Sequence, residues 1–148
     1  MFVNLGCGEK KMDDSIGVDF RKTDVADVVH DLSVNPWPFE DEQFDGAYAF
    51  DIIEHMIWVI PFLDECWRIL KPGAHLYIRT TNFEAEQSYC DPTHFHFFTL
   101  ESFDFFDPQT LIGYRYPWYS KYKWRIDKEK SGRSGEELVF DLEKLGEA

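Results

Sequence analysis

The chain has 148 residues, of which 28 are acidic and 15 are basic, so its formal net charge at pH 7 is −13. This length predicts one domain over residues 1–148 and excludes two independent ones. Apolar residues make up 44% and aromatic residues 18%, which excludes a chain that is disordered by composition. The acidic excess argues against nucleic acid or an anionic membrane as a partner.

Cysteine content and hydropathy indicate the compartment. The three cysteines, Cys7, Cys66 and Cys90, are odd in number and irregularly spaced, so they predict no disulfide framework. No apolar run reaches the roughly 18 residues of a membrane span. The chain does not open with the pattern of a signal peptide. We therefore expect a cytoplasmic protein.

Short apolar segments predict strands in the first half of the chain. These segments are residues 2–5, 16–20, 28–32 and 44–50. The connections 9–15 and 21–27 are shorter than the dozen or so residues that a parallel crossover usually needs. We expect their helices to be single turns or absent.

One helix stands out between residues 59 and 70. Its apolar stripe is formed by Val59, Phe62, Leu63, Cys66, Trp67 and Leu70. Pro61 suits the first turn, and Lys71-Pro72-Gly73 ends the helix. Asp64 precedes Arg68 by four residues, which predicts an ion pair on the polar face.

The second half predicts a fifth strand at 75–80 and a helix at 99–106. Residues 122–127 and 137–142 flank a Ser-Gly-Arg-Ser-Gly turn and predict a terminal hairpin. Strands that alternate with crossovers favour an α/β fold with a doubly wound, mostly parallel, Rossmann-like sheet. The hairpin adds an antiparallel strand at one edge.

The residues that end the strands indicate a ligand site, because such sheets bind ligands beyond their carboxyl ends. Gly6 and Gly8 let the backbone approach a ligand, although two glycines alone also fit a plain tight turn. Asp19 ends the second strand and suits a ribose diol. Asp31 can accept a hydrogen bond from an adenine amine while Leu32 covers the ring.

The order of these motifs resembles class I S-adenosylmethionine-dependent methyltransferases, in particular the small methyltransferase type 11-like branch. The motifs are Val3-Asn4-Leu5-Gly6-Cys7-Gly8, Gly17-Val18-Asp19, Asp31-Leu32, Phe44-Asp45, Glu54-His55 and Leu70-Lys71-Pro72-Gly73. The resemblance covers roughly residues 3–82, and the segment from Asp91 to His94 also fits that branch. Asn4 stands where many members carry an acid.

The resemblance implies S-adenosylmethionine as cofactor and a class I methyltransferase fold. The residues expected at the cofactor are Leu5, Gly6, Cys7, Gly8, Asp19, Phe20, Asp31, Leu32, Phe50 and His55. Gly6 and Gly8 would line its methionine part, and Phe50 would border the sulfonium.

We expect methyl transfer to a small-molecule acceptor, and analogy suggests a sugar or glycan intermediate. His94 is the first candidate for a general base and His55 the second, because imidazole titrates near neutral pH. Asp91 is expected beside them in the acceptor pocket. The alternative function is a regulatory domain that binds the cofactor without catalysis.

Three rival interpretations remain open. A nicotinamide dinucleotide site would need a third glycine where Lys11 stands. Cys90, Asp91, His94 and His96 could suggest a metal site, but one short cluster is weak, and we expect no metal. The aromatic belt over residues 95–124 could form core and lid, an acceptor pocket or the face of a homodimer.

Overall fold

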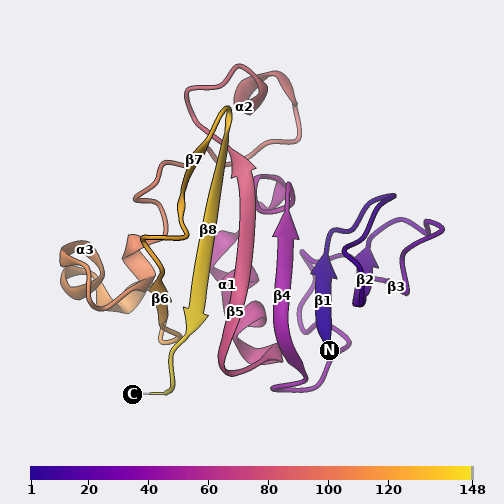
Figure 1. Ribbon diagram of the computed structural model, residues 1–148, viewed down its shortest axis with the longest axis horizontal. Helices are drawn as coiled ribbons and strands as arrows, with labels where there is room; N and C mark the ends of the chain where they lie inside the picture. Colours follow the sequence, from indigo (N-terminus) through magenta and orange to yellow (C-terminus); the bar gives the residue numbers. More distant parts are fainter. Residues whose placement is uncertain (148) are drawn as a thin grey trace.

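The computed structural model describes residues 1–147, which build one eight-stranded sheet (Figure 1). The strand order is β3-β2-β1-β4-β5-β8-β6, and β7 pairs with β8. The strands are β1 Phe2–Leu5, β2 Ser15–Asp19, β3 Val28–Val29, β4 Phe44–Phe50, β5 Leu70–Thr81, β6 Trp124–Ile126, β7 Gly132–Ser134 and β8 Glu137–Lys144. The last residue of the single domain expected over 1–148 lies outside the described residues.

The first five strands pair in parallel, so their carboxyl ends share one edge of the sheet. The observed bounds of β1 and β4 match the sequence prediction, and those of β2 differ by one residue. β3 is shorter than the expected 28–32. The reason is local: the Asp31 carboxylate accepts hydrogen bonds from the Ser33 amide and hydroxyl, which starts a turn.

The first two crossovers contain no helix, as their lengths predicted. Hydrogen bonds from polar side chains, and not packed helices, fix the position of these loops. The Asn4 Oδ1 atom accepts a hydrogen bond from the Met12 amide at 2.8 Å. The Asp27 Oδ2 atom accepts from the Gly17 amide at 2.8 Å and from Lys11 Nζ at 2.6 Å. Asn4 is therefore occupied in stabilising the fold.

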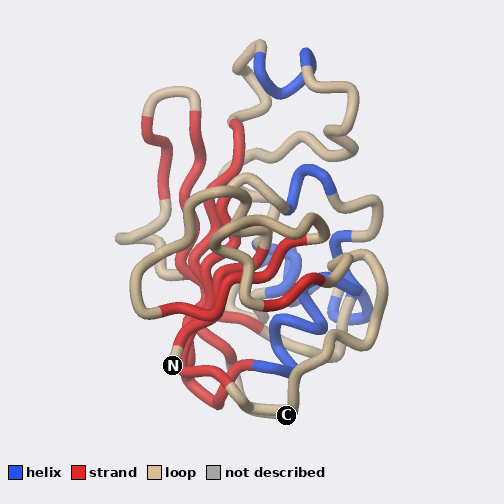
Figure 2. Tube along the Cα trace, turned by 90° about the vertical axis from the view of Figure 1, so that its right-hand side faces the viewer, coloured by secondary structure: helices blue, strands red, loops and turns tan. Residues whose placement is uncertain are grey.

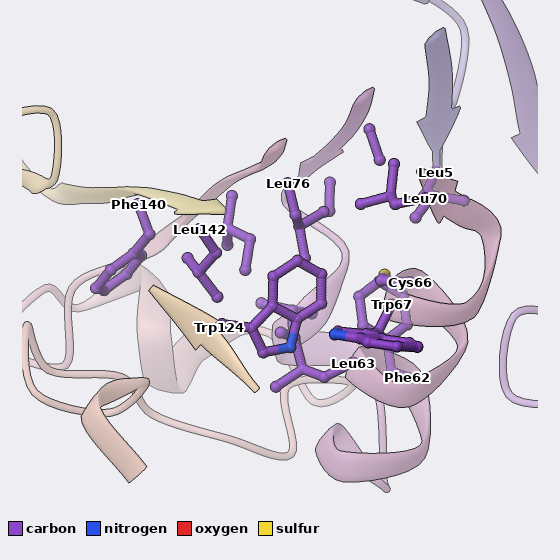
Figure 3. Close-up of a cluster of buried hydrophobic side chains, with 14 of the residues drawn as sticks. Leu5, Phe62, Leu63, Cys66, Trp67, Leu70, Leu76, Trp124, Phe140 and Leu142 are labelled. Atoms are coloured by element: carbon purple, nitrogen blue, oxygen red, sulfur yellow. The ribbon is translucent and has the colours of Figure 1, made fainter. Parts of the chain in front are cut away.

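Helices cover one side of the sheet (Figure 2). They are α1 Val59–Ile69, α2 Gln87–Cys90 and α3 Leu111–Arg115, with 3-10 turns η1 Ile53–His55, η2 Asp104–Phe106 and η3 Pro117–Tyr119. The predicted helix over 59–70 is confirmed, and its apolar stripe packs beneath β5, β6 and β8 (Figure 3). None of the described helices has the length and apolar character that a membrane span requires.

The expected pair between Asp64 and Arg68 does not form. Arg68 binds Glu65 through Nε at 2.7 Å and Asp41 through Nη1 at 2.8 Å. Asp64 accepts a hydrogen bond from the Ser120 hydroxyl at 2.6 Å instead. Glu65 is the better partner because it is buried beside the loop that carries Trp37, whose amide it also binds.

The C-terminal strands confirm the antiparallel addition, since β8 pairs with β5 and β6 pairs with β8. The turn expected between them contains one more strand, β7, at Gly132–Ser134. The helix predicted at 99–106 was wrong: only η2 is helical there. Ser102 Oγ accepts from the Thr99 amide and Thr99 Oγ1 accepts from the Glu101 amide, so local side-chain bonds favour turns over a helix.

Candidate functional site

A cavity of about 600 Å³ opens at the carboxyl ends of β1, β2 and β4. Its volume lies within the range of about 300–1,000 Å³ that is typical of small-molecule sites. The lining residues are Gly6, Gly8, Asp19, Phe20, Arg21, His30, Asp31, Leu32, Ser33, Asp51, Ile52, His55, Met56, Ile57, Thr93 and Phe95. Seven of the residues expected at a cofactor are among them: Gly6, Gly8, Asp19, Phe20, Asp31, Leu32 and His55.

At the glycine turn, the backbone itself borders the cavity. Gly6 and Gly8 have φ of 66° and 58°, a backbone region that residues other than glycine rarely occupy. A Cβ atom on Gly6 would lie 2.8 Å from Ile52 Cγ1. A Cβ atom on Gly8 would meet no heavy atom closer than 3.9 Å, so it would project into open space beside the cavity. Gly8 thus leaves room for a ligand.

Asp19 binds the glycine turn and also lines the cavity. Its side chain is nearly buried, and its carboxylate accepts hydrogen bonds at 2.9 Å from the amides of Gly8 and Arg21. The Nε atom of Arg21 lies 3.3 Å away. A carboxylate has about four acceptor sites, so these bonds orient the group and leave it able to accept from a ligand hydroxyl.

Asp31 and Leu32 form a polar and an apolar wall. Both hydrogen bonds from Ser33 go to Oδ1 of Asp31, which lowers the pKa of this carboxyl and leaves Oδ2 available. Leu32 is buried, and Met56 and Ile57 line the same cavity. A flat ring with an exocyclic amine suits this combination.

The second group of expected site residues is assembled by a loop. Residue Asp91 accepts hydrogen bonds from the Thr93 amide and hydroxyl, at 2.8 and 2.7 Å. Thr93 Oγ1 lies 2.9 Å from His55 Nδ1, and the rings of His55 and His94 are 4.7 Å apart. The Phe95 amide donates to the Glu54 carbonyl, which ties the loop to η1. The three candidate catalytic residues, His94, His55 and Asp91, are therefore neighbours.

Of these three residues, His55 lines the cavity, and His94 and Asp91 are not among its lining residues. His94 lies behind it and binds the Ser88 carbonyl through Nδ1 at 3.1 Å. In the metal cluster that the sequence suggested, Asp91 Oδ2 lies 3.6 Å from His94 Nε2, but Cys90 and His96 do not converge with them. His96 binds the Ile57 carbonyl, and Cys90 is exposed beside the Gln87 carbonyl.

Three expected cofactor residues are not among those that line the cavity. Phe50 lines a second hollow, on the other face of the sheet, with Phe2, Tyr48 and Tyr77. The reason is the pleat: Phe50 points to the same face as Tyr48, two residues before it. The side chains of Leu5 and Cys7 are buried in the core.

Asp51 was missing from the expected site. It follows β4, has φ of 56°, and lines the cavity. Its amide donates to the Arg79 carbonyl at 2.8 Å, and its carboxylate pairs with the Arg79 guanidinium. A non-glycine residue in this strained region often marks a functional site. Its position directly after a strand was the signal that could have identified it.

Comparisons with known proteins agree with this geometry. A family profile described as "Methyltransferase domain" matches residues 4–78, more than half of the chain. The human mitochondrial ubiquinone biosynthesis O-methyltransferase is 31% identical over 65 residues, which are 44% of this chain and 15% of that protein. The match thus spans only a small part of that relative.

Solved structures show the same fold. An S-adenosylmethionine-dependent methyltransferase from Aquifex aeolicus superposes with a TM-score of 0.64 at 14% identity, covering 97% of this chain and 81% of that chain. The Burkholderia thailandensis 1,6-didemethyltoxoflavin-N1-methyltransferase, solved with S-adenosylhomocysteine, gives 0.64 at 13% identity, with coverages of 98% and 71%. The expected Rossmann-like α/β class with C-terminal antiparallel strands is confirmed.

Proposed function

The chain belongs to the methyltransferase-domain family, and from this premise we propose that it transfers a methyl group from S-adenosylmethionine to a small-molecule acceptor. One observation carries the proposal: the glycine turn, Asp19 and the Asp31–Leu32 pair, far apart in sequence, surround a single cavity. The expected acceptor class, a sugar or glycan intermediate, stays a prediction, as does the absence of a nucleic-acid partner.

We assign the binding roles from the chemistry of each wall. The open space beside Gly8 fits the amino-acid part of the cofactor. The oriented carboxylate of Asp19 fits the ribose hydroxyls, and Asp31 with Leu32 fits the adenine amine and ring. When bound, the cofactor supplies a methyl group on a positively charged sulfur that is already a good leaving group. The contribution of the chain is then mainly to position the acceptor.

The acceptor end of the cavity is proposed to lie at His55, Thr93 and Phe95, which line it together with Asp31 and Leu32. His55 is held by Thr93, which is held in turn by Asp91. This chain of hydrogen bonds fixes the imidazole and leaves Nε2 free to take a proton from an acceptor. His94 and Asp91 act as positioning residues in this proposal.

The decisive experiment measures binding and turnover separately. Calorimetric titration with S-adenosylmethionine and S-adenosylhomocysteine should show one site per chain for each ligand. Incubation with radiolabelled cofactor and a panel of small hydroxyl and amine compounds then tests transfer. No binding of either ligand at millimolar concentration would overturn the proposal. Binding without transfer to any acceptor would favour the alternative of a regulatory, non-catalytic domain.

A further inference from the structure

Three side chains beside the cavity bring metal-binding atoms together. The carboxylate of Glu54 and the rings of His55 and His94 each offer an atom within 4.8 Å of the others. Glu54 and His55 belong to η1, and His94 follows α2, so the cluster depends on the loop that joins these elements. Two imidazoles and one carboxylate are a ligand set found in metal sites with open positions.

The hydrogen bond of His94 fixes which ring nitrogen is free. Its Nδ1 atom lies 3.1 Å from the buried Ser88 carbonyl. A carbonyl oxygen only accepts, so Nδ1 carries the hydrogen. The lone pair of the neutral ring is therefore on Nε2, which lies 3.6 Å from Asp91 Oδ2, too far for a hydrogen bond. A metal-binding histidine commonly donates its other N–H to a backbone carbonyl in this way.

His55 is fixed in the same tautomer by a longer chain of bonds. The Asp91 carboxylate only accepts, so the Thr93 hydroxyl donates its hydrogen to Asp91 Oδ1 at 2.7 Å. Thr93 Oγ1 can then only accept from His55, whose Nδ1 atom lies 2.9 Å away and must carry the hydrogen. The second imidazole thus also presents its lone pair on Nε2.

Glu54 is a buried carboxylate without a balancing cation. It is 1% exposed and accepts a hydrogen bond from the Thr80 hydroxyl at 2.8 Å. Within residues 1–147, the Thr80 hydroxyl is the one side chain that bonds to it, and no lysine, arginine or histidine forms an ion pair with it. Buried charges in proteins are usually paired or coordinate a metal, so a divalent cation would supply the missing positive charge.

We propose that Glu54, His55 and His94 bind one divalent transition-metal ion, with Zn²⁺ as the probe ion. Metal–nitrogen bonds of about 2.0–2.1 Å would place the ligand atoms roughly 3.3 Å from one another. They now lie within 4.8 Å, so the side chains must approach one another by at most about 1.5 Å. Of the three ligands, His55 lines the cavity, so the ion would be reached from the cavity at this residue.

Binding of the ion does not depend on the proposed function, but a role in methyl transfer rests on it. An ion at this place would lower the pKa of an oxygen acceptor. With the ion bound, His55 would be a ligand, and this role would replace the role as a base that it has in the proposed function without the ion. Such a site favours a hydroxyl group over an amine as the methyl acceptor.

The test uses the full chain, freed of metal by dialysis against a chelator. Titration with Zn²⁺ should give one site per chain, and Co²⁺ should produce visible absorption bands. His94→Ala and Glu54→Gln should each weaken Zn²⁺ binding by about tenfold or more. His96→Ala is the matched control, because its ring binds the Ile57 carbonyl outside the cluster. Circular dichroism checks that each variant folds, and His94→Gln is used in place of His94→Ala if that variant does not fold.

Two results would overturn the site: no Zn²⁺ binding at millimolar concentration, or equal weakening by His94→Ala and His96→Ala. Titration with S-adenosylhomocysteine in the presence of chelator separates this proposal from the previous one. Retained binding of that ligand without Zn²⁺ binding refutes only the metal site. Loss of S-adenosylhomocysteine binding with intact Zn²⁺ binding refutes only the proposed function.

Discussion

Asp19 combines a structural role with the proposed role in binding. Its carboxylate holds the Gly8 amide and the backbone and side chain of Arg21, while the residue lines the cavity. These bonds orient the group and leave it able to accept a hydrogen bond from a ligand. The shape of the glycine turn and the position of the proposed ribose contact therefore depend on one side chain.

Replacement of this carboxylate tests the cofactor assignment. Asp19→Asn keeps the size of the side chain but removes its charge and one acceptor. Hydrogen bonds to charged groups contribute about 1.5–3 kcal/mol, so the affinity for S-adenosylhomocysteine should fall by about tenfold to a hundredfold. Asp24→Asn, on the exposed part of the next loop, is the matched control. Calorimetry that finds the same affinity in both variants would refute the assignment.

Helix α1 depends on a polar anchor as well as on its apolar stripe. Glu65 is buried and accepts hydrogen bonds from the Trp37 amide at 2.7 Å and from Arg68 Nε and Nη2 at 2.7 and 2.8 Å. Arg68 also donates to the carbonyls of Trp37 and Phe39. The long connection before β4 is thereby fastened to the helix that follows the strand.

This anchor predicts a pH-dependent contribution to stability. Burial raises the pKa of Glu65, but the bonds from Arg68 and Trp37 outweigh burial and lower it below the usual 4.5. A lowered pKa means that the stabilisation is present above the unfolded pKa and is lost as pH falls through the folded one. Glu65→Gln should therefore cost about 1–3 kcal/mol at pH 7 and less at pH 3.5.

Urea denaturation at the two pH values measures this difference. Glu40→Gln is the control, since Glu40 is exposed and the stability of that variant should follow the wild type at both pH values. A loss in Glu65→Gln that is the same at pH 7 and pH 3.5 would show that the charge of Glu65 is not what anchors the helix.

The whole molecule is asymmetric across its sheet. The helices lie on one side (Figure 2). The opposite face carries a hollow of about 400 Å³ lined by rings of Phe2, Tyr48, Phe50 and Tyr77. Further aromatic residues are exposed around α3 and η3 at the edge that β6 forms. The C-terminal aromatic belt thus divides into a buried part, such as Phe103 and Phe106, and an exposed remainder.

The exposed apolar residues of α3 and η3 lead us to predict a homodimer, as the sequence suggested. Leu111, Tyr114 and Trp118 are 82%, 77% and 71% exposed. Exposed apolar clusters of this kind often mark interaction sites. Sedimentation should show concentration-dependent association of the wild type, and the double variant Leu111→Ser with Trp118→Ser should shift it to the monomer. Trp58→Ser is the control, because Trp58 is 73% exposed but belongs to the start of α1. A monomeric wild type at high concentration would refute the prediction.

The sequence by itself determined the features that depend on local pattern. β1, β4 and α1 were predictable because alternation, helical periodicity and bounding residues act over a few positions. The order of Gly6, Gly8, Asp19 and Asp31 predicted that these residues would line one cavity, since the carboxyl ends of parallel strands meet at one edge.

Only the tertiary structure decided which side chains meet across long separations. The contact between His55 and His94 depends on the loop whose Phe95 amide binds Glu54, and no local pattern encodes a contact over such a distance. The same holds for Glu65, which outcompeted Asp64 for Arg68 because a distant loop buries it. The neighbours Phe50 and Asp51 show the same on the smallest scale. Asp51 has a positive φ and lines the cavity, whereas the pleat of the strand directs Phe50 to the other face of the sheet.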